Sequence, residues 1–123
     1  MLQVNATKLA TVAVLCLQGQ IVTGETEVLR EAVGSLSDVS AVKLDLARVN
    51  TVDAGGLGVM LALREQLESN GIRFELMNVT KWVSRVLQLT RLDTVFRITS
   101  AVEYFPAVAQ SRTAAVPPFA SCA

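Results

Sequence analysis

The chain has 123 residues, of which 51% are apolar and 18% are charged, as expected for one folded domain with its own core. Lysine plus arginine equals aspartate plus glutamate, 11 against 11, which argues against a protein that binds nucleic acid through phosphate charge. Histidine is absent, and this excludes histidine general-base catalysis, serine–histidine triads and most zinc sites. We therefore expect no cofactor, no metal and no nucleic-acid partner.

The first part of the chain predicts a pair of strands. Residues 1–7 alternate weakly, and residues 11–18 form a continuous apolar run typical of a strand buried on both faces. A turn at residues 8–10 would join them as an antiparallel hairpin. Gly19 and Gln20 are expected to end the second strand.

The uncharged stretch of residues 9–24 does not predict a membrane span. A span needs about 20 predominantly apolar residues, and this stretch contains Gln18, Gly19 and Gln20. No convincing signal-peptide cleavage site follows Leu17. We expect a cytoplasmic protein without direct membrane insertion.

A helix is expected to open at Thr23-Gly24, with Glu25 and Glu27 in its first turn, where the helix dipole favours negative charge. Gly34 and the polar run of residues 35–40 end it. Five apolar residues recur at helical spacing, namely Val28, Leu29, Ala32, Val33 and Leu36.

The rest of the chain alternates strands and helices. The expected elements are a strand at 41–46, a helix at 56–70 that stops at Asn70-Gly71, a strand at 72–77, a helix at 81–89 capped by Thr80, a short strand near Arg97 and Ile98, and a helix from Ser100 to about Gln110. From Ser111 the composition changes, and we expect a mobile tail.

This order predicts an α/β fold. Strands that alternate with helices form parallel crossovers, so we expect a mixed, mostly parallel sheet of about four to five strands, an N-terminal antiparallel hairpin and about four helices. The domain is expected to span 1–110, and the tail 111–123.

One segment carries most of the functional information. In residues 44–63, LDLARVNTVDAGGLGVMLAL, a strand runs into a tight turn and then a helix. Asp53 is placed to cap the helix start, where free backbone N–H groups carry partial positive charge. Gly55, Gly56 and Gly58 would let an anion or a partner's backbone come close. The alternative is a strand-to-helix turn that needs glycine and binds nothing.

The block LDLARVNTVDAGGLGVMLALREQLESNGIRFEL resembles the signature region of the STAS domain family, the anti-sigma-factor antagonists and their relatives. The later stretch NVTKWVSRVLQLTRLDTVF fits the same family, so the resemblance covers about residues 5–110. It implies a non-enzymatic, bacterial protein-interaction module in transcription regulation. The partner would be an anti-sigma factor or a kinase-like regulatory protein.

The resemblance also assigns roles to single residues. In these antagonists, a serine or threonine after an aspartate is phosphorylated by the partner kinase, and phosphorylation breaks the complex. Asp53 matches that aspartate, and Gly56, Leu57 and Gly58 match the residues that follow. Ala54 occupies the phospho-acceptor position and Gly55 the second serine, so the usual hydroxyl is missing. The predicted partner-binding residues are Asp53, Ala54, Gly55, Gly56, Leu57 and Gly58.

Two other functions stay open. The sequence is also similar to the STAS subunit of bacterial phospholipid-transport ABC systems, whose turn is matched by Val52–Leu57 except at Ala54, and the partner would then be an ABC ATPase. The other open function is that of an enzyme or nucleotide-binding protein that uses the helix start. The glycine-rich turn lacks the lysine of a P-loop, however. Whether the chain is a homodimer is left open.

Four further residues have two interpretations each. Asp45 either forms an acid pair with Asp53 or marks a strand end with local hydrogen bonds. Thr51 and Thr80 are turn or cap residues, or alternative phosphorylation sites. Trp82 either anchors an interface or is partly buried against the sheet.

Overall fold

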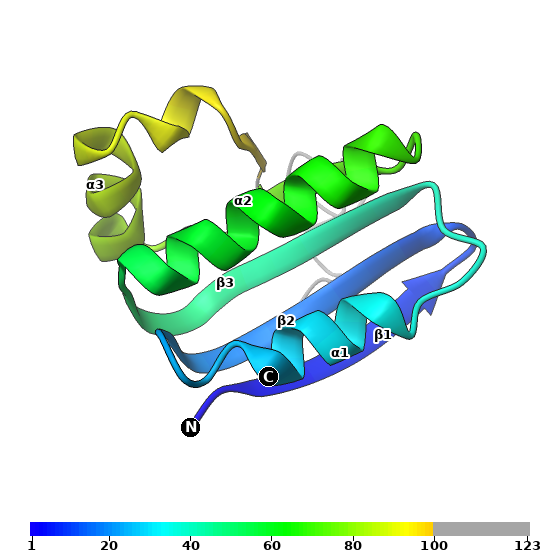
Figure 1. Cartoon of the computed structure of the whole chain (residues 1–123), viewed down its shortest axis with the longest axis horizontal. Helices are drawn as coiled ribbons and strands as arrows, with labels where there is room; N and C mark the ends of the chain where they lie inside the picture. The colour runs from blue at the N-terminus through cyan, green and yellow to red at the C-terminus, as the bar shows by residue number, and fades with distance from the viewer. Residues whose placement is uncertain (100–123) are drawn as a thin grey trace, which may run out of the picture.

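The computed structural model describes residues 1–99, which form a five-stranded mixed sheet and three α-helices. The sheet order is β1-β2-β3-β4-β5, in which β1 runs antiparallel to β2 and the other neighbours are parallel (Figure 1). The strands are β1 (Gln3–Leu9), β2 (Val12–Ile21), β3 (Ala41–Val52), β4 (Arg73–Met77) and β5 (Arg97–Thr99). The helices are α1 (Glu27–Gly34), α2 (Ala54–Ser69) and α3 (Lys81–Leu89), followed by a 3-10 turn at Leu92–Thr94.

The predicted fold class is confirmed, including the hairpin and the parallel remainder of the sheet. Residues 1–99 hold three α-helices rather than the four expected for the whole chain. The fourth helix, from Ser100, and the tail from Ser111 lie outside the described residues. None of the described helices is long and apolar enough to cross a membrane.

β2 is longer than expected. Gly19 and Gln20 do not end it, because the strand continues to Ile21. Gly19 has a φ of 114°, and the pairing with β3 shifts register on both sides of it. The glycine therefore forms an irregularity within the ladder instead of a strand end. The hairpin turn before β2 also differs slightly: Leu9 pairs with Val12, so the turn consists of Ala10 and Thr11.

The first helix starts later than expected. It begins at Glu27, so Glu27 lies in its first turn and Glu25 precedes it. The Glu25 carboxylate instead lies 3.2 Å from the amino group of Met1. The expected end at Gly34 is confirmed.

The main core lies between the sheet and the three helices, which cover the same face (Figure 1). Alternate residues of the strands point to this face. The strands contribute Leu15, Leu17, Val42, Leu44, Leu46, Phe74 and Leu76, and the helices contribute Leu29, Val33, Met60, Leu63, Leu67, Val83 and Leu87.

The central part of the opposite face of the sheet is also buried. It carries an apolar cluster of Val14, Cys16 and Met77, and an ion cluster in which Lys43 and Arg73 both contact the Glu75 carboxylate. All residues from Ala13 to Leu17 are buried. The prediction that this strand is buried on both faces is thus confirmed.

Candidate functional site

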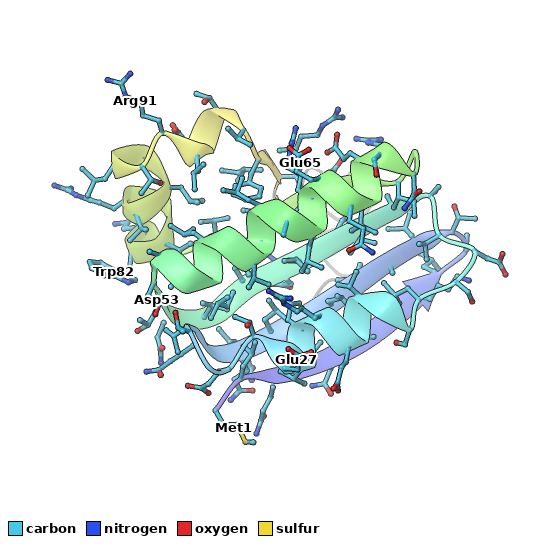
Figure 2. All side chains as sticks on the ribbon, in the orientation of Figure 1. Met1, Glu27, Asp53, Glu65, Trp82 and Arg91 are labelled. Atoms are coloured by element: carbon cyan, nitrogen blue, oxygen red, sulfur yellow. The ribbon has the colours of Figure 1, made fainter. Side chains whose placement is uncertain are left out.

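The candidate site lies at the carboxyl edge of the parallel strands. β2 and β3 end together, because Ile21 pairs with Val52. The loop that leads to α1 and the start of α2 therefore meet at this edge. Figure 2 shows Asp53 here, at the beginning of α2.

Asp53 caps α2, as predicted. Its backbone is extended, and its Oδ1 accepts a hydrogen bond from the N–H of Gly56 at 2.8 Å. The N–H of Thr23 also donates to this carboxylate, at 3.1 Å from Oδ2. The N–H of Gly56, followed by that of Thr23, holds the pKa of Asp53 below its ordinary value. Asp53 is therefore a structural carboxylate that joins two loops.

Thr23 was not singled out by the sequence as a site residue. It lies 30 residues before Asp53, and only the pairing of β2 with β3 brings the two together. Its hydroxyl also lies against the first turn of α2: a Cβ built on Gly55 would be 1.9 Å from Thr23 Oγ1. No local pattern in the sequence could have identified this contact.

The first two glycines of the turn lie close to the end of β2 and the loop that follows it. A Cβ on Gly56 would lie 1.8 Å from the carbonyl oxygen of Ile21, closer than real Cβ atoms come. A Cβ on Gly55 would instead meet a side chain, the hydroxyl of Thr23, which can move more easily than backbone. Packing within the chain therefore explains Gly56, whose missing side chain lets α2 start directly against the end of β2.

Two residues of the turn are left facing solvent. Ala54 and Gly58 are exposed, and a Cβ on Gly58 would meet no atom within 4 Å. Asp53 and Gly55 are half-buried, whereas Gly56 and Leu57 are buried. Ala54 and Gly58 are therefore the two solvent-exposed residues among the six predicted partner-binding residues.

Asp45 does not form an acid pair with Asp53. The seven residues between them extend along one strand, so the two positions are about 25 Å apart. Asp45 accepts a hydrogen bond from the N–H of Ala47 at 3.0 Å and one from the Asn78 amide at 3.3 Å. The expected local hydrogen bond is confirmed. The prediction that Asp45 marks a strand end is wrong, because β3 continues to Val52.

Burial dominates the electrostatics of Asp45. It raises the pKa of the carboxyl, against the opposing effects of the Ala47 N–H, the Asn78 amide and Arg48. The side chain is thus buried on the sheet, at a distance from the turn.

The remaining candidates are separated as follows. Thr80 is the N-cap of α3, and its Oγ1 accepts the N–H of Val83 at 3.3 Å. Thr51 is half-buried within β3, where it pairs with Gln20. Trp82 is 57% exposed, so it does not pack mainly against the sheet.

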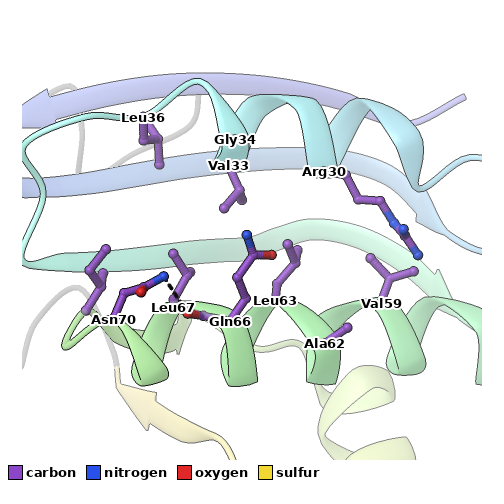
Figure 3. A pocket seen from close by; sticks show the side chains of 11 residues that line it. Arg30, Val33, Gly34, Leu36, Val59, Ala62, Leu63, Gln66, Leu67 and Asn70 are labelled. Carbon is purple, nitrogen blue, oxygen red and sulfur yellow. Dashed lines mark hydrogen bonds between the residues drawn. The ribbon is translucent and has the colours of Figure 1, made fainter.

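A groove of about 310 Å³ lies between α1 and α2, away from the turn (Figure 3). Its walls are mostly apolar side chains such as Val33 and Leu63, with Arg30 and Gln66 among them. None of the predicted site residues lines it. Within residues 1–99, no group of three or more Cys, Asp or Glu side chains is arranged to hold a metal ion.

A model of the STAS domain matches residues 3–105 of the chain. An anti-sigma factor antagonist from Mycobacterium paratuberculosis has a similar fold, with a TM-score of 0.74 and 22% identity over 89% of this chain and 96% of that one. The anti-sigma factor antagonist SpoIIAA from Bacillus, solved in its unphosphorylated and phosphorylated forms, gives TM-scores of 0.63 and 0.64. Both are 20% identical to this chain, over 93% and 88% of it and over 100% and 99% of SpoIIAA.

A sulfate transporter family protein from Wolinella succinogenes is also similar, with a TM-score of 0.69 and 17% identity over 85% of this chain and 93% of that one. At these identities the structural likeness concerns the fold, which antagonists and a transporter-family protein share. The match of the family model, which spans most of the chain, settles the family: the chain belongs to the STAS domain family.

Proposed function

We propose that this STAS domain is a non-enzymatic, cytoplasmic regulatory module that binds an anti-sigma factor or a kinase-like regulator. The interface is the turn of Asp53–Gly58 together with the exposed side of α2. Occupancy of the partner by this chain would release a sigma factor. The observation that carries the proposal is the exposure of Ala54 and Gly58 on a helix start whose other contacts are fixed within the fold.

The exposed side of α2 suits a close protein contact. Ala54, Gly58 and Ala62 are all exposed and follow one another at four-residue spacing, which places them on one face of the helix. Because none of them has a side chain larger than a methyl group, a partner's backbone can approach α2 closely. Farther along the helix, the exposed Glu65 and Gln66 provide a polar rim.

The alanine at the start of α2 defines the regulation that we propose. A phosphate adds about −1.5 to −2 charges at neutral pH, and at position 54 it would stand within the exposed interface. Ala54 has no hydroxyl to carry it. We infer that the chain acts as a permanently unphosphorylated antagonist and stays competent to bind.

Co-purification of the tagged chain from its own cells tests the proposal. We expect it to bring down a small kinase-like regulator in a stoichiometric complex. The competing function, an accessory subunit of a phospholipid transporter, would instead yield an ABC ATPase with its permease. Recovery of the second complex in place of the first would contradict the antagonist function.

The non-enzymatic part of the proposal has its own test. Incubation of the purified chain with ATP or GTP, with and without magnesium, is expected to give no hydrolysis above buffer. Hydrolysis that follows the protein through purification and disappears in an Asp53→Ala variant would show that the start of α2 is catalytic.

A further inference from the structure

Helix α3 exposes apolar side chains to solvent on a face that does not pack against the core. Trp82 is 57% exposed and Leu89 is 78% exposed. They are seven residues apart, so they lie on the same side of the helix and about 10 Å apart along its axis. Val83 and Leu87 are buried on the opposite side. The exposure of Trp82 and Leu89 therefore does not result from a loosely attached helix.

The same face of α3 is positively charged. Lys81 and Arg85 are exposed beside Trp82, and the helix contains no acidic residue. Neither cation takes part in an ion pair within residues 1–99. Both line a shallow hollow of about 390 Å³, together with Val79, Ser84 and Gln88. A carboxylate in this hollow would meet two cations and the polar groups of Ser84 and Gln88.

We propose that Lys81, Trp82, Arg85 and Leu89, here called the α3 face, form a docking surface for an acidic helical segment of a protein partner. The two apolar side chains match the two-turn spacing of apolar residues along a partner helix. Tryptophan and arginine are the residue types that most often dominate protein interfaces. The two cations select glutamate or aspartate beside the apolar contacts.

A lipid surface fits the α3 face less well. α3 has nine residues, and its other apolar side chains are used by the core. Two exposed apolar side chains do not make the broad apolar face that an interfacial helix buries in a bilayer.

The docking surface goes beyond the proposed function, because no residue of α3 belongs to the turn of Asp53–Gly58. It lies at the same end of the molecule, since α2 and α3 follow the parallel neighbours β3 and β4 (Figure 2). A single partner can therefore contact both surfaces, or two partners can use them separately.

Trp82 is the only tryptophan of the chain, so its fluorescence reports directly on this surface. The probe is a synthetic helical peptide with leucines seven residues apart, flanked by glutamates. Titration at low salt is expected to shift the Trp82 emission to shorter wavelength and to saturate. A matched peptide with every glutamate replaced by glutamine is expected to bind about tenfold more weakly.

Variants that keep the tryptophan provide the controls. Arg85→Glu and Leu89→Ala are each expected to weaken binding of the acidic peptide by about tenfold. Arg30→Glu and Val28→Ala, which change an exposed cation and an exposed apolar residue on α1, are expected to bind like the unmodified chain. Circular dichroism of all four variants is used to check that they are folded.

Three kinds of result would overturn the proposal. The first is a failure of the peptide test: the emission stays unchanged with the acidic peptide, or the Arg85→Glu and Arg30→Glu variants bind it with equal affinity. The second is a shift caused by phosphatidylglycerol-containing vesicles but not by the peptide, which would identify a lipid surface. The third is a shift on raising the protein concentration alone, which would identify a second copy. The proposed function of the turn is tested on a different complex and is unaffected by these outcomes.

Discussion

The carboxylate of Asp53 accepts the backbone N–H of Thr23, 30 residues earlier in the chain, at 3.1 Å. The same carboxylate caps α2 through the N–H of Gly56. One side chain thus fixes the loop after β2 to the start of α2, and it sets the position at which Ala54 faces solvent. The interface that we propose depends on this connection.

Asp53→Asn should lower stability at neutral pH, because an ionised carboxylate accepts N–H hydrogen bonds more strongly than an amide. The pKa of Asp53 is lowered in the folded chain, so its contribution is present above the unfolded-state pKa and is lost as pH falls through the folded pKa. Urea unfolding of both proteins between pH 7 and pH 2 measures this. The stability difference should shrink steadily below about pH 4.

The control for this series is Asp93→Asn, which changes an exposed aspartate in the 3-10 turn after α3. Its effect at neutral pH should be small. A pH-independent difference between the unmodified chain and Asp53→Asn would show that the charge of Asp53 does not hold the turn.

Gly56→Ala should destabilise the fold by roughly 3 kcal/mol, since the new Cβ would meet the backbone oxygen of Ile21. Gly58→Ala should be neutral or stabilise the fold by roughly 0.5–1 kcal/mol, because the site is open and alanine is the better helix former. Thermal unfolding of the two variants gives the comparison. Equal melting temperatures of the two variants would mean that the start of α2 does not pack against the end of β2.

Gly55→Ala differs from Gly56→Ala because the obstacle is a side chain, the hydroxyl of Thr23. The double variant Thr23→Ala with Gly55→Ala should recover much of the stability that Gly55→Ala loses. A double-mutant cycle measures the coupling energy between the two positions. Simple additivity would contradict the contact.

The buried ion cluster on the other face of the sheet gives a separate prediction. Lys43 and Glu75 are 4% and 2% exposed and in contact. Burial raises the pKa of Glu75, but the hydrogen bond and charge of Lys43, together with Arg73, outweigh burial, and the net pKa is lowered. Lys43→Met should cost about 3 kcal/mol in urea unfolding, because it removes a main partner of a buried carboxylate.

The matched variant for this cluster combines Lys43→Met with Glu75→Leu. It should be clearly more stable than Lys43→Met alone, because the buried carboxylate that needs Lys43 is removed together with it. If the single and double variants unfold at the same urea concentration, the carboxylate of Glu75 is not buried with Lys43.

The sequence predicts the parts of this molecule that are determined locally. The Asp53 cap, the Thr80 cap and the stop at Gly34 are confirmed, because capping and termination depend on residues within one turn. The length of β2 past Gly19 was not predicted, since an irregularity in the ladder depends on pairing with a neighbouring strand.

The same reasoning applies to the site. Asp53 and the glycines stand out as a motif, but their actual contacts, with Thr23 and Ile21, arise from the parallel pairing of two strands. Exposure of Trp82 was likewise undetermined, because helical spacing does not say how far the sheet extends beneath α3.

Calorimetric titration of the co-purified regulator with the unmodified chain and with Ala54→Asp tests the central claim most directly. The new carboxylate beside Asp53 must be desolvated on docking, so binding should weaken by about 1–3 kcal/mol, whereas Ala54→Ser should bind nearly as well as the unmodified chain. Ala6→Asp, on an exposed alanine of β1, controls for the added charge and should bind normally. Equal affinities of the unmodified chain and Ala54→Asp would contradict the account, because the start of α2 would then lie outside the interface.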